Sequence, residues 1–558
     1  MSTEQPGGGG RGPSPVNRRG FLRQVGVGAA AVATASAVGL PAFERTATAQ
    51  EVDALEKATS PKKRRKLAYK QRIDAANLAR SRPQPTNVAN GDETAVTNYA
   101  AMYSKAMPHN ALGEPDVDAY QKLLVAVDSG SPTDFAAVPV AGAAKLENPQ
   151  AALAFDLMGA DSHALFMPAA PAFASARQAA EMAELYWAAL LRDVPFEDFA
   201  SSAEVAAAAD DLSGFSDYAA PKEGGRVTPS VIFRGDLPGD LDGPFLSQFL
   251  VRDIPRWGAQ NISAKIRTAA AGADYMTDFA SWLNVQNGGA PVAAQFDATP
   301  RYLRNLRDLA EYARIDVLFQ PYLSALMLLT PAAMRAPVDP GLPPRSSSNQ
   351  SGFVEFGVPH FLSLLGEVSV RALRAVWYQK WMVHRRIRPE EFGGRVHNKV
   401  TGAADYPLHQ ELLDSASIDA VFDKYGTYLL PMAAAEGSPT HPSYASGHAA
   451  IAGAAVTILK AMFDESFVIP NPVVPDRDGL SLVPYTGGEL TLGRELNKLA
   501  SNMSIGRNVL GVHWHSDYLE GVRLGEAVAI ALLEEQKACH NQDFTMSLTK
   551  FDGTAVTV

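Results

Sequence analysis

The chain has 558 residues, of which 46% are hydrophobic and 20% are charged, and its formal net charge is −10. This length exceeds one ordinary hydrophobic core, so we expect two domains or one large body. The acidic balance argues against a nucleic-acid partner and against a protein that lies on an anionic membrane surface. A single cysteine, Cys539, excludes an intrachain disulfide and any all-cysteine metal cluster. Its position near a predicted helix end is typical of a buried thiol.

Residues 1–49 contain the parts of an export signal in the expected order. Asn17–Arg23 (NRRGFLR) fits a twin-arginine motif, Val25–Leu40 is a mild apolar run rich in Ala and Gly, and Ala47–Ala49 offers a cleavage site. The apolar run is too short and too weakly apolar for a stable membrane span. We therefore predict export by the twin-arginine route, cleavage near residue 49, and a periplasmic or extracellular location.

The first half of the remaining chain is predicted to be helical. The basic stretch Pro61–Lys66 is expected to be the solvated start of a helix that ends near Arg80, and residues 194–300 mix short helices with loops. Hydrophobic periodicity predicts further helices at Val96–Met107, Val117–Asp128, Ala151–Phe155, Ala170–Asp193 and Leu303–Leu328, the last one broken at Pro321.

A connector rich in Pro and Ser, Ala336–Ser351, is the best candidate for a domain boundary. It would separate an N-terminal helical region, 50–345, from a C-terminal helical catalytic region, 346–558. In the second region, core-facing helical spacing occurs at Phe361–Arg388, Ala450–Met462, Leu490–Ser504 and Tyr518–Lys537. Small strands are candidates at Phe467–Val474 and Thr554–Val558. The predicted fold class is mainly α, with two helical bundles, long loops and minor β-structure.

Three polar segments stand out in the C-terminal region, and the first is KWMVHRRIRP, residues 380–389. Lys380, His384 and Arg388 recur at i, i+4 and i+8, so a continuous helix would place them on one face. The turns before them are apolar and are expected to be buried, and cations that emerge from a buried helix need an anionic partner. This spacing therefore indicates an anion site.

A second explanation of this segment stays open. Pro389 disfavours helical geometry at the preceding residue, so Arg388 is expected at the frayed end of the helix, free to orient its guanidinium. The basic run could instead be a solvated helix face, which the adjacent Arg385 and Arg386 would suit. Taken alone, the segment favours the solvated face.

The second segment is HPSYASGH, residues 441–448. Its prolines and small residues predict a loop that opens a helix near Ser446, and the amides of Gly447 and His448 would then form a helix N-terminus, which binds anions readily. Gly447 has no Cβ, so its backbone can approach a ligand closely. His448, in the first turn, would point at the same place. Ordinary capping by Ser446 beside an uninvolved histidine explains this segment equally well.

The third segment is GRNVLGVHWHSD, residues 506–517. Arg507 is a planar cation suited to bidentate oxyanion binding. His513 and Asp517 are four residues apart at a helix start, so the carboxylate can hold one imidazole nitrogen and leave the other free as a ligand or nucleophile. His515 would point to another face. A capping Asp beside a satisfied histidine is the alternative, but three such coincidences in one chain are improbable.

Together, the three segments resemble the vanadium-dependent haloperoxidases, whose wider superfamily includes bacterial acid phosphatases and lipid phosphatases. The shared pattern is Lys…Arg-Pro, then Ser-Gly-His, then Arg…His…Asp. In this chain the pattern falls on Lys380, Arg388-Pro389, Ser446-Gly447-His448, Arg507, His513 and Asp517.

Two features resemble the algal and cyanobacterial bromoperoxidase branch of that superfamily. Seven residues separate Lys380 from Arg388, where many relatives have six. His441, seven residues before His448, matches a second active-site histidine that bromoperoxidases carry.

The resemblance covers most of the chain after the signal, because Asn90–Glu93 and the long N-terminal half also look like that branch. Two positions depart from the pattern. Ala445 stands where a Pro often precedes Ser-Gly-His, and Gly506 stands where a Ser often precedes the Arg. These departures concern the loops and leave the ligand set unchanged.

The resemblance implies that orthovanadate is the cofactor and that His513 is the ligand of its vanadium. The side chains and amide that would bind the vanadate oxygens are Lys380, Arg388, Ser446, Gly447 and Arg507. It also implies that His448 is a general acid and base, that Lys380 polarises peroxide, that Asp517 orients His513, and that His441 tunes the pocket or its halide preference.

The implied reaction is that of a haem-independent haloperoxidase. Hydrogen peroxide would oxidise a halide, bromide most readily and iodide also, to hypohalous acid, which halogenates small organic acceptors. The resemblance also implies a homo-oligomer. The alternative is a secreted acid phosphatase of the same superfamily, in which His513 would be the nucleophile and His448 would protonate the leaving group. Phosphate could occupy the same pocket, a non-enzymatic phosphate-holding scaffold is a further alternative, and a structural calcium site stays open.

Overall fold

The computed structural model describes residues 60–330 and 333–558, so the predicted export signal lies outside the described residues. The described part is mostly helical, which confirms the predicted fold class. Its α-helices are α3 (Pro61–Ser81), α4 (Asp92–Ala95), α5 (Val117–Ser129), α6 (Pro132–Ala136), α7 (Ala176–Leu190), α8 (Ala203–Ser213), α9 (Gln248–Val251), α10 (Phe279–Gln286), α11 (Leu306–Ile315), α12 (Gln320–Leu329), α13 (Pro343–Ser346), α14 (Val358–Trp377), α15 (Pro389–Val400), α16 (Gln410–Leu413), α17 (Ala416–Tyr425), α18 (Gly447–Met462), α19 (Leu492–Leu510) and α20 (His515–Lys537).

Short turns and hairpins make up the remaining regular structure. The 3₁₀ turns are η1 (Thr97–Tyr99), η2 (Pro149–Leu153), η3 (Ser162–Ala164) and η4 (Phe196–Asp198), and η5 (Tyr378–His384) is a π turn. The strands form three separate antiparallel pairs: β1 (Ile254–Trp257) with β2 (Gln260–Ile262), β3 (Val473–Pro475) with β4 (Leu482–Pro484), and β5 (Ser547–Thr549) with β6 (Ala555–Thr557). The predicted strand at 554–558 therefore forms, whereas the one at 467–474 is reduced to its last two residues.

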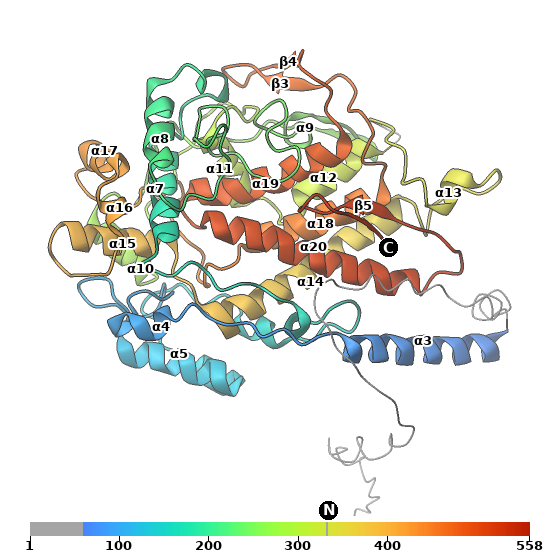
Figure 1. Ribbon diagram of the computed structural model, residues 1–558, viewed down its shortest axis with the longest axis horizontal. Coiled ribbons are helices and arrows are strands. Elements are labelled where there is room, and N and C mark those ends of the chain that lie inside the picture. Colours follow the sequence, from blue (N-terminus) through green and yellow to red (C-terminus); the bar gives the residue numbers. More distant parts are fainter. Residues whose placement is uncertain (1–59, 331–332) are drawn as a thin grey trace, which may run out of the picture. The chain divides into compact units, whose positions relative to one another are not determined.

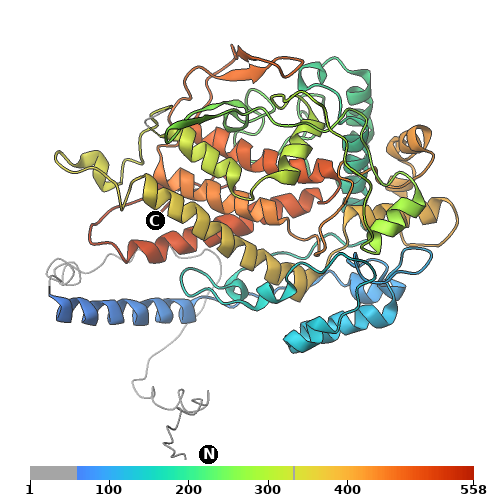
Figure 2. The same ribbon diagram turned by 180° about the vertical axis from the view of Figure 1, so that it is seen from behind.

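Helix α18 is the centre of the core. Every residue of α18 except His448 is buried, as expected of a helix that is apolar on all sides. It contacts α14, α19 and α20, and the four helices lie side by side in both views (Figure 1, Figure 2). Among the described helices, none combines the length and apolarity needed to cross a bilayer.

Helices from both sides of the predicted domain boundary pack together. Helix α11 contacts α19, and α12 contacts α14 and α18. The predicted division between residues 345 and 346 itself stays a prediction.

Three sequence predictions about local structure outside the polar segments are wrong. Val96–Met107 is not a helix: only η1 is helical there, because Asn98 and Tyr99 have positive φ and the backbone of Tyr103 donates instead to the carbonyl oxygen of Arg385. Ala151–Phe155 forms only the 3₁₀ turn η2. Cys539 is exposed rather than buried, because it follows the end of α20.

Close contact between α18 and α20 depends on two glycines. A Cβ added to Gly525 of α20 would lie 2.0 Å from the carbonyl oxygen of Ala450, and one added to Gly453 of α18 would lie 2.1 Å from that of Val522. Both contacts are with helix backbone, which cannot move aside independently. The two helices can therefore approach this closely only with glycine at both positions.

We expect Gly525→Ala to lower the free energy of unfolding by about 1–3 kcal/mol, because the new methyl group overpacks the contact between α18 and α20. Urea unfolding followed by circular dichroism measures this change. The control is Gly366→Ala in α14, where an added Cβ meets nothing within 4 Å. That variant should keep or raise stability by up to about 1 kcal/mol. Equal stability of both variants would contradict the packing argument.

Candidate active site

The first polar segment is not one continuous helix, contrary to the prediction. Helix α14 ends at Trp377, and residues 378–384 form the π turn η5, whose backbone bonds span one residue more than those of an α-helix. Arg385 then adopts φ 42°, which ends the helical turn. Arg388 is not a frayed helix end but the N-cap residue of α15, because Pro389 suits the first position of a new helix.

Three buried cations nevertheless come together from three elements. Lys380 in η5 donates from Nζ to the carbonyl oxygens of Pro442 at 2.6 Å and Ser443 at 2.7 Å. Arg388 precedes α15, and Arg507 lies in α19. Burial lowers the pKa of each cation, and the nearby positive charges lower the pKa of Lys380 further, while that of Arg507 falls to about 10. A bound anion would offset this repulsion.

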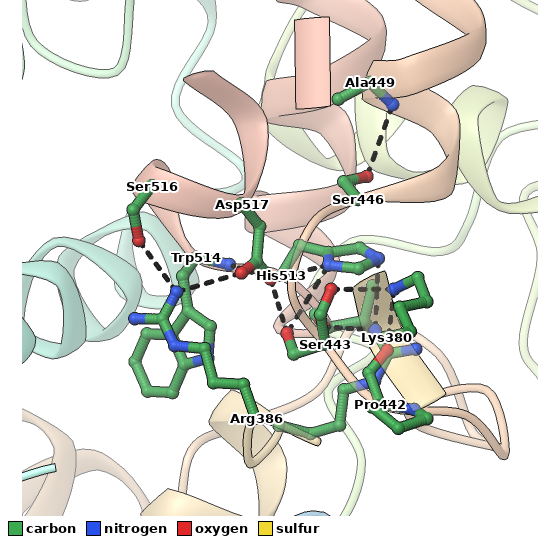
Figure 3. A network of polar contacts seen from close by, with 12 residues as sticks. Lys380, Arg386, Pro442, Ser443, Ser446, Ala449, His513, Trp514, Ser516 and Asp517 are labelled. Atoms are coloured by element: carbon green, nitrogen blue, oxygen red, sulfur yellow. Dashed lines mark hydrogen bonds and ion pairs between the residues drawn. The ribbon is translucent and has the colours of Figure 1, made fainter. Parts of the chain in front are cut away.

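His513 and Asp517 make the contact that their spacing predicts (Figure 3). Nδ1 of His513 lies 2.7 Å from Oδ2 of Asp517, and Nη1 of Arg388 lies 3.1 Å from Nε2. The carboxylate accepts a hydrogen bond from Nδ1–H, so Nε2 is the unprotonated nitrogen. Burial, with the charges of Arg388 and Lys380, holds the pKa of His513 well below its usual value. The ring is therefore neutral, and Nε2, which accepts from Arg388 Nη1, is the nitrogen that a ligand would bind.

The loop of the second segment opens α18 as predicted. Ser446 is its N-cap residue, and the Ser446 hydroxyl accepts a hydrogen bond from the backbone of Ala449 at 3.4 Å. Gly447 begins the helix against Trp377, and His448 follows in the first turn. This helix start brings His448 near Arg507 and Lys380, whose charges act on its ring.

His448 is held by Asp316, which the sequence analysis did not identify. Nε2 of His448 lies 2.9 Å from Oδ1 of Asp316, the residue that follows α11. Burial and the charge of Arg507 lower the pKa of His448, and Asp316 opposes that shift. No sequence motif connects these residues, which are 132 positions apart.

His441 lies on the guanidinium of Arg388. Nη2 of Arg388 is 3.0 Å from Nδ1 and 3.3 Å from Nε2 of His441, and Nε of Arg388 donates to the His441 carbonyl oxygen at 2.9 Å. The ring of Trp377 covers the imidazole at a centroid distance of 4.6 Å. Burial and the charges of Lys380 and Arg388 hold the pKa of His441 well below its usual value. The ring is therefore neutral.

Arg385 and Arg386 do not form a solvated face, so that alternative is wrong. Arg385 is buried and pairs with Glu93 at 2.8 Å. Arg386 is buried as well and donates to Asp517 Oδ1 at 2.9 Å and to Glu181 Oε2 at 3.0 Å. Arg386 thus fixes the carboxylate that orients the imidazole of residue 513, although no local spacing in the sequence indicates this role.

Ser443 is a second contact of Asp517 that the sequence analysis missed. Its hydroxyl donates to Oδ2 of Asp517, the same oxygen that faces His513 (Figure 3). The carboxylate therefore has partners on both oxygens, with Arg386 on the other one. The position of Ser443 inside the second segment is the signal that could have identified it.

Two further histidines of the segments face elsewhere. His384 is buried edge-on against Tyr444, and neither of its ring nitrogens has a hydrogen-bond partner among residues 60–330 and 333–558. His515 lies 3.3 Å from Glu184, which helps to raise its pKa to about 9. Neither contacts the predicted ligand residues by a hydrogen bond in the described part of the chain.

The donor set fits a tetrahedral or larger oxyanion. Lys380, Arg388 and Arg507 supply positive charge, and Nε of buried Arg507 finds no hydrogen-bond acceptor among the described residues. Such an orphaned donor in a cationic cavity is accounted for by an anion that accepts from it. The neutral imidazole of His513 adds one nitrogen that can bond to the central atom of that anion. These features are those of a vanadate or phosphate site.

The fold and site together define a class: helical-bundle proteins with a buried oxyanion site, in which a neutral histidine is held by a carboxylate. A family model described as the second helical-bundle domain of VCPO matches residues 361–542. The vanadium-dependent bromoperoxidase of Corallina officinalis is 36% identical over 590 aligned positions, which cover 89% of this chain and 98% of that protein. The vanadium-dependent bromoperoxidase of Ascophyllum nodosum is also 36% identical, over 535 aligned positions that cover 91% of this chain and 95% of that protein.

A solved structure agrees with these relatives. The homohexameric second vanadate-dependent bromoperoxidase of Ascophyllum nodosum matches with a TM-score of 0.85 and 32% identity, over 89% of this chain and 91% of that one. The chain therefore belongs to the vanadium-dependent haloperoxidase family, as the sequence resemblance predicted.

We expect Arg386→Gln to lower the free energy of unfolding by about 3–5 kcal/mol, because it leaves the buried carboxylates of Asp517 and Glu181 without their cation. Chemical denaturation measures the loss. The matched control is Arg374→Gln, whose partner Asp156 keeps a second arginine, Arg371. The control should lose less than about 1 kcal/mol. Similar losses in both variants would show that Arg386 has no special role in stability.

Proposed function

We propose that this protein uses hydrogen peroxide to oxidise bromide, and also iodide, to hypohalous acid, which then halogenates small organic acceptors. Two relatives are named vanadium-dependent bromoperoxidases, and the match to this chain covers nearly the whole length of each. The observation that carries the proposal is the neutral imidazole of His513, anchored by Asp517 on one nitrogen and facing buried Arg388 with the other. A haem or flavin is not needed for this reaction.

In this proposal the cofactor is orthovanadate, with His513 as the ligand of the metal. The groups that would hold its oxygens are Lys380, Arg388, Arg507, the Ser446 hydroxyl and the Gly447 amide. When bound, vanadate supplies a Lewis-acid centre that activates peroxide towards the halide without a change in its own oxidation state. The protein contributes the positive charge that keeps this anion in the pocket and the imidazole orientation set by Asp517.

His448 is the proposed proton acceptor and donor. Its Nε2 faces the carboxylate of Asp316 and carries a proton there, so Nδ1 is free to accept one from incoming hydrogen peroxide. The lowered pKa keeps the ring neutral before the substrate arrives. Lys380 would polarise the peroxide with its third N–H, because two carbonyl oxygens occupy the other directions. His441 would adjust the pocket through its contact with Arg388.

The test is bromination of a phenolic dye by metal-free protein with and without added vanadate. We expect activity only after vanadate is added, and a loss of at least about 100-fold in His513→Ala, because the cofactor loses its only protein ligand. The control is His163→Ala, which removes an exposed histidine that pairs with Asp161, and it should keep wild-type activity. A secreted acid phosphatase would instead hydrolyse p-nitrophenyl phosphate and be inhibited by vanadate. That result would reject the haloperoxidase proposal.

We also propose that the protein is exported and assembles as a homo-oligomer. A related solved structure is described as homohexameric, which supports the second point. The twin-arginine motif at Arg18 and Arg19 supports the first. Substitution of both arginines by lysine should retain the protein inside the cell, whereas the wild-type protein should be recovered outside the inner membrane with a new N-terminus near residue 50. Mass spectrometry of both fractions checks this. Export of the lysine variant would contradict the proposed route.

A further inference from the structure

Glu147 is a half-exposed acidic side chain beside this cationic site. Its carboxylate lies 3.5 Å from Nε2 of His441, and 53% of its side chain is exposed, whereas the His441 side chain is 7% exposed. His441 in turn contacts Arg388, which contacts His513. A path of direct contacts therefore leads from solvent at Glu147 to the imidazole at the base of the site.

The backbone of Glu147 is fixed by residues of the same site. Its N–H donates to the carbonyl oxygen of Thr440 at 2.9 Å, and its own carbonyl oxygen accepts from Nε1 of Trp377 at 3.1 Å. Trp377 also covers the ring of His441. The backbone of Glu147 is therefore anchored beside Trp377, and its carboxylate lies 3.5 Å from the His441 ring.

The charge of Glu147 acts on all three pocket cations. It raises the pKa of Lys380, of Arg388 and of Arg507, although burial and other cations outweigh this effect. Its partner His441 is neutral because burial and Lys380 hold the pKa of that ring well below its usual value. Glu147 therefore presents a negative charge that its own partner does not cancel.

Two other carboxylates of the site, those of Asp517 and Asp316, are buried and bind histidines. Asp517 is buried and bonds to His513, Ser443 and Arg386. Asp316 has a buried side chain and bonds to His448. Both hold catalytic histidines in the proposed function, and neither is exposed to incoming ions. Glu147 is the solvent-exposed carboxylate on this path of contacts.

We propose that Glu147 is a specificity-determining residue that repels anions at the pocket entrance in proportion to their charge. It would admit a singly charged halide more readily than a doubly charged phosphate and leave neutral hydrogen peroxide unaffected. This inference rests on the proposed function for the identity of the halide substrate. Its physical basis is that the Coulomb energy of an ion at a fixed distance scales with the ion's charge.

The consequence is a preference for monoanions over dianions, which three cations alone could not provide. Lys380, Arg388 and Arg507 attract a dianion more strongly than a monoanion, so without a counteracting charge phosphate would compete with both halide and vanadate. A negative charge at the entrance penalises the dianion twice as much in free energy. If removing Glu147 tightens monoanion binding by a certain factor, it should tighten dianion binding by roughly the square of that factor.

The experiment compares wild-type protein with Glu147→Gln, which keeps the shape of the side chain and the backbone contacts. In vanadate-loaded enzyme at low ionic strength, we expect the KM for bromide to fall about three- to tenfold with kcat and the KM for peroxide unchanged. In metal-free protein, calorimetry at pH 8 should show a larger gain in affinity for inorganic phosphate. Both gains should shrink in 0.5 M sodium methanesulfonate, because salt screens exposed charges.

Two variants serve as controls. Glu147→Asp keeps the charge and should behave like wild-type protein. Glu436→Gln removes another half-exposed carboxylate, but one that Arg314 already pairs with at 2.8 Å, so its effect should be below about twofold.

A fall in kcat, or a parallel change in the KM values for bromide and peroxide, would show that Glu147 positions His441 and would overturn the proposal. Unchanged phosphate affinity in Glu147→Gln would overturn it as well. The calorimetric measurement does not depend on halogenation. A wild-type protein that fails to brominate therefore rejects the proposed function separately, while the phosphate result still decides the role of Glu147.

Discussion

Burial of three positive charges at one site is the constraint on which the rest of this structure depends. Lys380 and Arg388 are oriented mainly by carbonyl oxygens, those of Pro442 and Ser443 for the lysine and those of His441 and Val512 for the arginine. Carbonyl dipoles fix the direction of a cation without cancelling its charge. The site therefore keeps an excess of positive charge, which a bound anion would offset.

The helical core and the loops both contribute to meeting this constraint. Helix α18 is buried along almost its whole length, and His448 lies in its first turn. Arg507 lies within α19 and Asp517 within α20, whereas Ser443 comes from the loop before α18 and His513 from the turn before α20. The carboxylates next to the histidines are held in turn by buried partners such as Arg386 and Ser443. The imidazole orientation is thus determined several contacts away from the ligand.

The sequence allowed prediction of those features that depend on short-range spacing. The contact between His513 and Asp517 follows from their spacing of four residues at a helix start. The start of α18 at Ser446 follows from the small residues and prolines that precede it. Features that depend on distant partners could not be predicted. Arg386 looked like a surface cation because its acidic partners lie more than a hundred residues away. Asp316 and Glu147 belong to no motif, and only the folded chain brings them to the histidines.

The π turn between Trp377 and Arg385 has a consequence for the two helices that flank it. A π turn accommodates one residue more than an α-helical turn, so the chain can hold an additional residue there without rotating the helix that precedes it. Helix α14 keeps its packing against α18 and α20, and α15 still begins at Pro389. The bulge is therefore local: it changes the path of the chain between Lys380 and Arg388 and not the helices on either side.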